Sequence, residues 1–139
     1  MTLSLEELVK IILMRSEQLE DELKKESEIR ELSVNQLHCI ELIMEKGNPG
    51  LSELARSLKI TRPSVTVMID RLEDHGYVRR VRSDTDRRSA HVHLTDKGVR
   101  AGQLHDTLHR DIASMLTSAL SEQEKEIMVV LLNKAMVEF

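Results

Sequence analysis

Residues 51–98 read LSELARSLKITRPSVTVMIDRLEDHGYVRRVRSDTDRRSAHVHLTDKG, and they carry the most specific structural signals in the sequence. Its apolar residues recur at helical spacing on both sides of a tight turn at Lys59 and Ile60, which predicts two short helices. Thr61 can cap the second helix by accepting a hydrogen bond from its first amides. Pro63 suits the first turn of that helix, because the amide that proline lacks would have no helical partner there.

The spacing at which apolar side chains recur changes after Gly76. Residues 89–94 alternate between polar and apolar side chains, and residues 77–82 form a similar short segment before the polar stretch 83–88. This pattern predicts two short strands joined as a hairpin. Two helices across a tight turn, followed by a basic hairpin, form a winged helix-turn-helix with the hairpin as its wing.

Three of the four helices expected around this stretch begin at capping boxes, in which a serine is followed three residues later by Glu or Gln, and the fourth opens with Thr95 and Asp96. The three boxes are Ser4 with Glu7, Ser33 with Gln36, and Ser121 with Glu124. The expected flanking helices cover residues 5–28, 34–46, 96–120 and 122–137. We therefore predict a mainly α fold with the element order α-α-α-α-β-β-α-α. The length of 139 residues corresponds to one domain, residues 1–139, with no internal repeat.

Composition excludes several classes of protein. Tyr77 and Phe139 are the only aromatic residues, which disfavours the base stacking used to bind single strands and RNA loops. Cys39 is the only cysteine, so the chain has no internal disulfide, as expected in a reducing compartment. No run of about 18 apolar residues is present, and Glu6 and Glu7 interrupt the first apolar stretch. We expect a cytoplasmic protein with no membrane or RNA partner.

The net charge of −4 hides an uneven distribution. Residues 1–50 carry 6 basic and 11 acidic side chains, residues 51–100 carry 11 and 7, and residues 101–139 carry 3 and 6. The middle third is therefore basic while both ends are acidic. Its arginines concentrate around the predicted hairpin, where a local basic cluster favours contact with a polyanion. A solvated charged face is the alternative interpretation.

Duplex DNA is the partner that this arrangement fits. The second helix of the pair has a polar N-terminal end whose free amides favour phosphate, and a helix fits the major groove, which is about 12 Å wide. The residues expected to contact DNA from this recognition helix are Thr61, Arg62, Pro63, Ser64, Thr66 and Arg71. Those expected from the wing are Arg80, Arg82, Ser83, Arg87 and Arg88. Asp84 and Asp86 are expected to pair with neighbouring arginines and hold the wing in shape.

These residues carry a resemblance to the MarR family of bacterial transcription regulators. The matching motifs are Leu54-Ala55, Ile60-Thr61, Ser64-Val65-Thr66, Asp70-Arg71-Leu72-Glu73, Gly76-Tyr77-Val78, Asp84-x-Asp86-Arg87-Arg88 and Leu94-Thr95-x-Lys97-Gly98. The resemblance implies that residues 51–98 form the DNA-binding lobe, and that residues 1–32 and 99–139 form the body of a homodimer. It also implies a repressor acting on a pseudo-palindromic operator with half-sites about one helical turn apart.

Histidines suggest a candidate zinc site. His105 and His109 are four residues apart, so both rings leave the same face of one helix. Some zinc-sensing MarR-type regulators complete such a pair with a Glu on the first helix and a His on the second. Glu20 and His38 fall at the matching positions, and the resemblance thus implies a four-ligand set.

A second resemblance leads to an acyl-type effector. The stretches Leu37-His38-x-Ile40, Arg80-Val81-Arg82-Ser83, His91-x-His93-Leu94-Thr95, Leu104-His105-x-x-x-His109 and Ser121-Glu122 are similar to MarR-type repressors of fatty-acid synthesis genes. Members of that subgroup respond to long acyl chains on acyl carrier protein, and this effector is slightly favoured. The same histidines would then brace a pocket. They could also be ordinary hydrogen-bonded side chains at a helix interface.

Other functional classes have weaker support. The sequence contains no phosphate-binding glycine loop, HExxH or GxSxG motif, so we expect no enzymatic activity. Cys39 lies in an apolar context and is expected to be a buried small side chain rather than a redox sensor. A winged helix can also serve as a protein-interaction adaptor that does not bind DNA. The arginine-bearing wing favours DNA binding.

Overall fold

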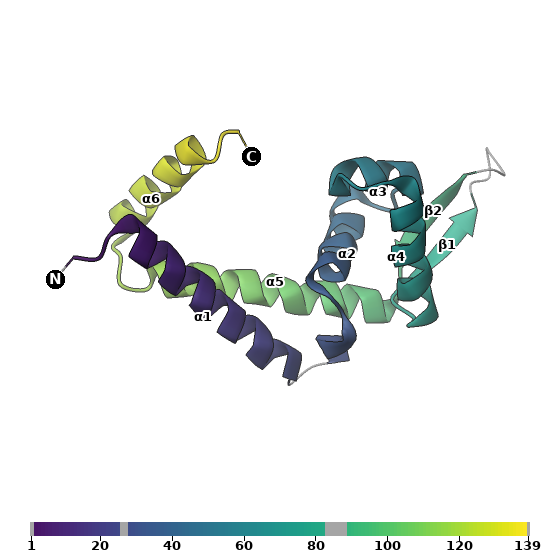
Figure 1. The fold of residues 1–139 in the computed structure, drawn as a ribbon, viewed down its shortest axis with the longest axis horizontal. Coiled ribbons are helices and arrows are strands. Elements are labelled where there is room, and N and C mark those ends of the chain that lie inside the picture. Colours follow the sequence, from purple (N-terminus) through teal and green to yellow (C-terminus); the bar gives the residue numbers. More distant parts are fainter. Residues whose placement is uncertain (1, 26–27, 83–88, 139) are drawn as a thin grey trace.

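The computed structural model describes residues 2–25, 28–82 and 89–138, and it has the mainly helical architecture predicted from the sequence (Figure 1). Its elements are α1 (Leu5–Lys25), the 3₁₀ helix η1 (Glu28–Glu31), α2 (Val34–Lys46), α3 (Leu51–Leu58), α4 (Arg62–Asp74), β1 (Val78–Arg82), β2 (Ala90–Leu94), α5 (Asp96–Thr117) and α6 (Glu122–Ala135). The winged helix-turn-helix is confirmed: α3 and α4 are the helix pair, and β1 and β2 form the wing.

Local hydrogen bonds explain where the helices begin. All three predicted capping boxes are present, each with a serine hydroxyl that accepts from the backbone three residues on and a side chain that reaches back. Helix α2 ends at Gly47, whose φ of +66° belongs to the left-handed region that glycine adopts easily.

Three helix ends differ from the sequence prediction. The first helix is described as far as Lys25, residues 26–27 lie outside the described residues, and Glu28, the predicted last residue, belongs instead to a 3₁₀ turn at Glu28–Glu31. Ile29 and Leu32 enter the core there, so burial of these side chains takes precedence over continuation of the helix. Helices α5 and α6 end at Thr117 and Ala135, within three residues of their predicted ends, where helix termini commonly fray.

The wing is an antiparallel hairpin that is anchored at its base. Val78 pairs with Leu94 and Arg82 with Ala90. A further bridge joins Gly50 to His91, and the Val92 amide donates to the Pro49 carbonyl at 2.9 Å. The segment before α3 therefore extends the hairpin by one more line of hydrogen bonds, which fixes the wing against the helix pair.

Most of the core lies in residues 28–82 and 89–105, which we call the lobe. This unit is larger than the DNA-binding lobe of residues 51–98 expected from the sequence. Its fully buried side chains come from η1 to α4 and from both strands, and they include Leu37, Ile40, Leu54, Val65, Ile69, Leu72, Tyr77 and Val92. Two glycines allow α5 to approach this core closely. A Cβ on Gly98 would lie 2.1 Å from the Tyr77 carbonyl oxygen, and one on Gly102 would lie 2.5 Å from the Met44 methyl.

The rest of the molecule forms what we call the arm, which consists of α1, residues 106–117 of α5, and α6. Figure 1 shows α1 beside α5, and α6 at the end of α5 that is remote from α3 and α4. None of the residues described for α1 and α6 is buried. Their exposed apolar side chains include Leu5, Leu8, Val9, Ile11, Leu13 and Met14 on α1, and Ile127, Val129, Val130, Leu131 and Leu132 on α6. Within the described ranges, no helix is both long and apolar enough to cross a membrane.

Candidate nucleic-acid interface

Helix α4 has one buried and one exposed face. Val65, Ile69 and Leu72 are fully buried, and their spacing of three and four residues directs one stripe of the helix into the core. The opposite face is left in solvent. Of the residues predicted to contact DNA from this helix, Thr61, Arg62, Pro63, Ser64 and Arg71 are exposed, while Thr66 is half-buried.

Hydrogen bonds hold the N-terminal end of α4 in place before any ligand binds. Thr61 Oγ1 accepts from the Ser64 amide at 3.2 Å and donates to Ser64 Oγ at 2.8 Å. The Arg62 guanidinium donates to Ser52 Oγ at 2.7 Å, which joins α4 to α3. Thr66 Oγ1 donates to the Arg62 carbonyl at 3.0 Å. This end of the helix offers ordered amides and a positive dipole end, the features that favour phosphate.

Val67 is an exposed residue that the sequence prediction missed. Its side chain is 52% exposed although it is apolar. It lies three residues after Ser64 and four before Arg71, so the three side chains share one stripe of α4. An apolar contact with a thymine methyl is a common way to read a base in the major groove. The i, i+3, i+7 spacing from Ser64 was the signal in the sequence.

Arg80, predicted to contact DNA from the wing, is already paired in this structure. Its guanidinium donates to Glu73 Oε1 at 2.8 Å and to Asp70 Oδ1, both on α4. The Arg80 amide also donates to Glu73 Oε2 at 2.8 Å. Partial burial disfavours the charge, but the hydrogen bonds and charges of Asp70 and Glu73 prevail and raise the pKa of Arg80. Arg80 therefore sets the wing at a fixed position relative to α4.

The remaining wing residues divide into two groups. Arg82 is exposed on β1, as is Arg79 on the same strand. Ser83, Asp84, Asp86, Arg87 and Arg88 lie outside the described residues. The predicted pairing of Asp84 and Asp86 with arginines, and the DNA contacts predicted for Ser83, Arg87 and Arg88, thus stay predictions.

A second polar cluster, within the lobe, joins η1 to the segment between α4 and β1 and to the start of α5. Tyr77 Oη donates to Glu31 Oε1 at 2.7 Å, and Lys97 Nζ donates to the His75 carbonyl at 2.8 Å. The Lys97 ammonium lies 4.4 Å from the centre of the Tyr77 ring and 3.6 Å from Glu31 Oε1. The Tyr77 hydrogen bond is the largest influence on Glu31 and, with Lys97, lowers the pKa of its carboxyl group.

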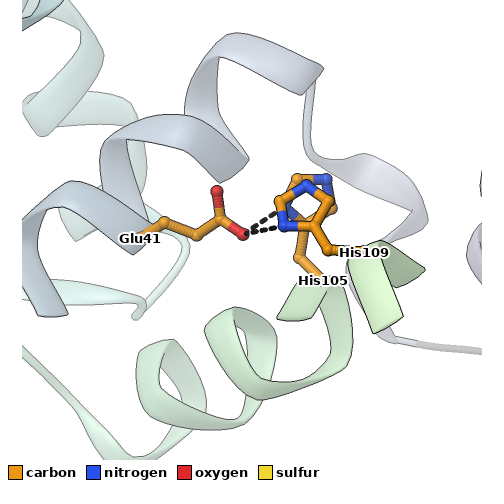
Figure 2. A group of neighbouring side chains, drawn as sticks. All are labelled: Glu41, His105 and His109. Atoms are coloured by element: carbon orange, nitrogen blue, oxygen red, sulfur yellow. Dashed lines mark hydrogen bonds and ion pairs between the residues drawn. The ribbon is translucent and has the colours of Figure 1, made fainter. Parts of the chain in front are cut away.

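The structure brings together two of the four residues predicted to hold zinc. His105 and His109 on α5 face Glu41 on α2, and the candidate ligand atoms of these three residues lie within 4.8 Å of one another (Figure 2). The His38 ring centre lies 5.8 Å from that of His105. Glu20 is outside this group, and its Oε1 atom lies 2.9 Å from Lys24 Nζ.

Glu41 is the carboxylate that sequence reasoning missed. It lies three residues after His38, so both side chains share one face of α2. That spacing was a signal, but the pairing of α2 with α5 had to be known to use it.

Cys39 is fully buried, as expected. Desolvation raises the pKa of its thiol to about 12, so the reactive thiolate is disfavoured at neutral pH.

Comparison with known proteins gives consistent matches. The MarR family model matches residues 32–90. The HTH-type transcriptional regulator YkoM of Bacillus subtilis (strain 168) is 33% identical over 69% of this chain, and the match spans 62% of that protein. The regulator MhqR of the same organism is 28% identical over 89% of this chain and 86% of its own length.

A solved structure extends the match over nearly the whole fold. FabT of Streptococcus pneumoniae, crystallised in complex with DNA, is 28% identical with a TM-score of 0.75, over 93% of this chain and 87% of that one. The family model spans α2, the α3–α4 pair and β1, both relatives are named as HTH-type regulators, and the FabT structure shares the fold described above. The chain belongs to the MarR family of winged helix-turn-helix transcription regulators.

Proposed function

We propose that this protein is a sequence-specific, double-stranded-DNA-binding regulator, acting as a repressor through the exposed face of α4. The observation that carries the proposal is the stripe of Ser64, Val67 and Arg71 opposite a fully buried face. The wing lies beside this helix through Arg80, and its strand carries the exposed Arg79 and Arg82. An α-helix in the major groove, flanked by arginines at the backbone or minor groove, is consistent with this geometry. The protein would act on the bacterial chromosome in the cytoplasm, as a binding protein rather than an enzyme.

We further propose a homodimer built by the arm. Apolar side chains on both α1 and α6 face solvent, and an apolar hollow of about 500 Å³ runs along α6. This hollow is lined by Leu120, Glu124, Ile127, Met128, Leu131, Leu132 and Ala135. A second copy of the chain supplies matching apolar surface, and a two-fold dimer presents two α4 helices to a pseudo-palindromic operator.

The first candidate effector is an acyl-type ligand, which the resemblance to repressors of fatty-acid synthesis genes supports. The proposal predicts that long-chain acyl donors change operator affinity and that short-chain donors do not. Equal effects of both, or no effect of either, would contradict it. Operator binding also distinguishes the proposed regulator from the alternative function, because a protein-interaction adaptor with the same fold would bind no operator at all.

Substitution of Arg71 tests DNA binding directly. The test measures fluorescence anisotropy with duplex DNA from the region upstream of the protein's own gene. We expect Arg71→Ala to weaken binding by about 1–3 kcal/mol, the usual contribution of one good base contact. Arg110→Ala, which removes an exposed arginine from the arm, should leave affinity unchanged. Equal affinities for all three proteins would contradict the assignment of α4.

A further inference from the structure

We propose that Glu41, His105 and His109 form a binding site for a divalent transition metal, with zinc as the best fit. The Nδ1 atom of His105 lies 2.6 Å from Glu41 Oε1, and that of His109 lies 3.7 Å from the same oxygen. Figure 2 shows both imidazole rings turned toward the Glu41 carboxylate. The two ring centres are 4.6 Å apart. Three metal-ligating side chains from two helices therefore converge on one point.

The geometry is close to that of a loaded site. Zinc bonds of about 2.0–2.1 Å at tetrahedral angles place neighbouring ligand atoms about 3.3 Å apart. The Glu41–His105 distance would lengthen and the His109 distance would shorten slightly to reach that value. His109 is 52% exposed, so its side chain has room to move, whereas His105 is held in place by burial.

The site opens to solvent through a hollow that suits a cation. A cavity of about 320 Å³ between α2 and α5 is lined by Glu41, Met44, Glu45, Gly102, Asp106 and His109. Three of these six residues are carboxylates, which attract a cation and disfavour an anionic ligand. The cavity gives a metal ion a path to Glu41 and His109 without opening of the core.

The donor set selects the class of metal. Two imidazoles and one carboxylate suit zinc and its neighbours, whereas calcium and magnesium prefer oxygen ligands alone. Three protein ligands leave a fourth position open, as in zinc sites that bind water or a further group. This set differs from the one implied by resemblance in two ways: Glu41 takes the place of Glu20, which is paired with Lys24, and His38 is not among the three residues that converge.

The position of the site between two helices implies a consequence for regulation, which rests on the proposed function. Helix α2 belongs to the lobe, and α5 continues from the lobe into the arm. A metal ion held by both would restrict movement of one relative to the other. Metal binding would then change the affinity of the dimer for its operator, provided that the arrangement of α2 and α5 that holds the metal differs in operator affinity from the other arrangements.

A competition titration tests the site without DNA. Full-length protein, purified without a histidine tag and stripped of metal, is titrated with Zn²⁺ against a chromophoric chelator. We expect one Zn²⁺ per chain and no competition from Mg²⁺ in excess. Loss of a residue that only hydrogen-bonds to a metal ligand weakens metal affinity by roughly 10–100-fold. Glu41→Gln alters a ligand itself and should therefore weaken zinc binding by more than that. Glu20→Gln, the matched control, should bind zinc like the unaltered protein.

His109→Ala gives a second readout that does not depend on the buried His105. It removes an exposed ring and should weaken zinc binding as Glu41→Gln does, with an unchanged circular dichroism spectrum. Failure of the unaltered protein to bind zinc, unchanged affinity in Glu41→Gln or His109→Ala, or lost affinity in Glu20→Gln would each overturn the proposal. DNA binding is measured separately, so loss of the metal site and loss of the proposed function are distinguishable.

Discussion

The lobe and the arm place their apolar side chains in opposite environments. In the lobe, Leu54, Ile69 and Leu72 are fully buried within one chain. In the arm, Ile127 and Leu131 on α6 are 58% and 59% exposed, although the helix is well capped and regular. The difference indicates that the lobe is completed by its own contacts, whereas the arm needs another molecule to cover it. The predicted homodimer satisfies that need.

Substitution of Leu131 should disrupt dimerisation through the arm and leave the lobe folded. Leu131→Glu places a charge on the apolar face twice in a two-fold dimer. Burial of a leucine contributes about 1.5–3 kcal/mol, so the dimer should lose about 3–6 kcal/mol. Light scattering should show monomers at micromolar concentration, and operator affinity should fall with them. Lys134→Glu, which changes charge at an exposed site on the same helix, is the control. A Leu131→Glu protein that stays dimeric would contradict the proposed interface.

Substitution of Gly98 should instead lower the stability of the lobe. The Cβ of Gly98→Ala would meet the Tyr77 carbonyl at 2.1 Å, and backbone cannot move aside easily. Overpacking of this kind costs about 1–3 kcal/mol, to be measured as a lower urea midpoint. Gly50→Ala is the matched control, because its nearest atom is the Ala90 carbonyl oxygen at 3.8 Å. Equal stability of both variants would show that α5 does not need this close approach.

A smaller effect is expected within the lobe, at Glu31, where η1 meets Tyr77 and the start of α5. Because the Tyr77 hydrogen bond and Lys97 lower the pKa of Glu31, its ionised form is favoured in the folded protein. Its contribution to stability is therefore present at neutral pH and is lost as the pH falls below the ordinary glutamate range, through the lowered pKa. Urea midpoints between pH 3 and pH 7 should show this loss, and Glu31→Gln should make the profile flatter. An identical profile in the variant would exclude Glu31 as a source of the pH dependence.

Local signals in the sequence were sufficient for most of the fold. The capping boxes at Ser4, Ser33 and Ser121, the cap at Thr61 and the stop at Gly47 depend on neighbouring residues, and all are confirmed. The 3₁₀ turn at Glu28–Glu31 was missed because it depends on burial of Ile29 and Leu32 in the distant core.

The site was only partly predictable for the same reason. The exposed face of α4 follows from helical periodicity, and Ser64 and Arg71, which are predicted to contact DNA, both lie exposed on it. The pairing of Arg80 with Asp70 and Glu73 depends on how the wing crosses α4. Glu41 joins His105 only because α2 packs on α5, a contact between residues 64 positions apart. Such long-range contacts leave no periodic trace in one sequence.

Binding of duplex DNA through α4 and the wing should depend steeply on the salt concentration. If the dimer neutralises about 6–10 phosphates through α4 and the wing, its affinity for the duplex should fall by about 10³–10⁵ between 50 and 200 mM salt. The measurement uses the full-length protein and duplex DNA from upstream of its own gene, with single-stranded DNA of the same sequence as reference. A steep fall for the duplex, with weaker binding to the single strand, is the predicted result. A flat salt dependence, or equal binding to duplex and single-stranded DNA, would contradict binding of duplex DNA through α4 and the wing.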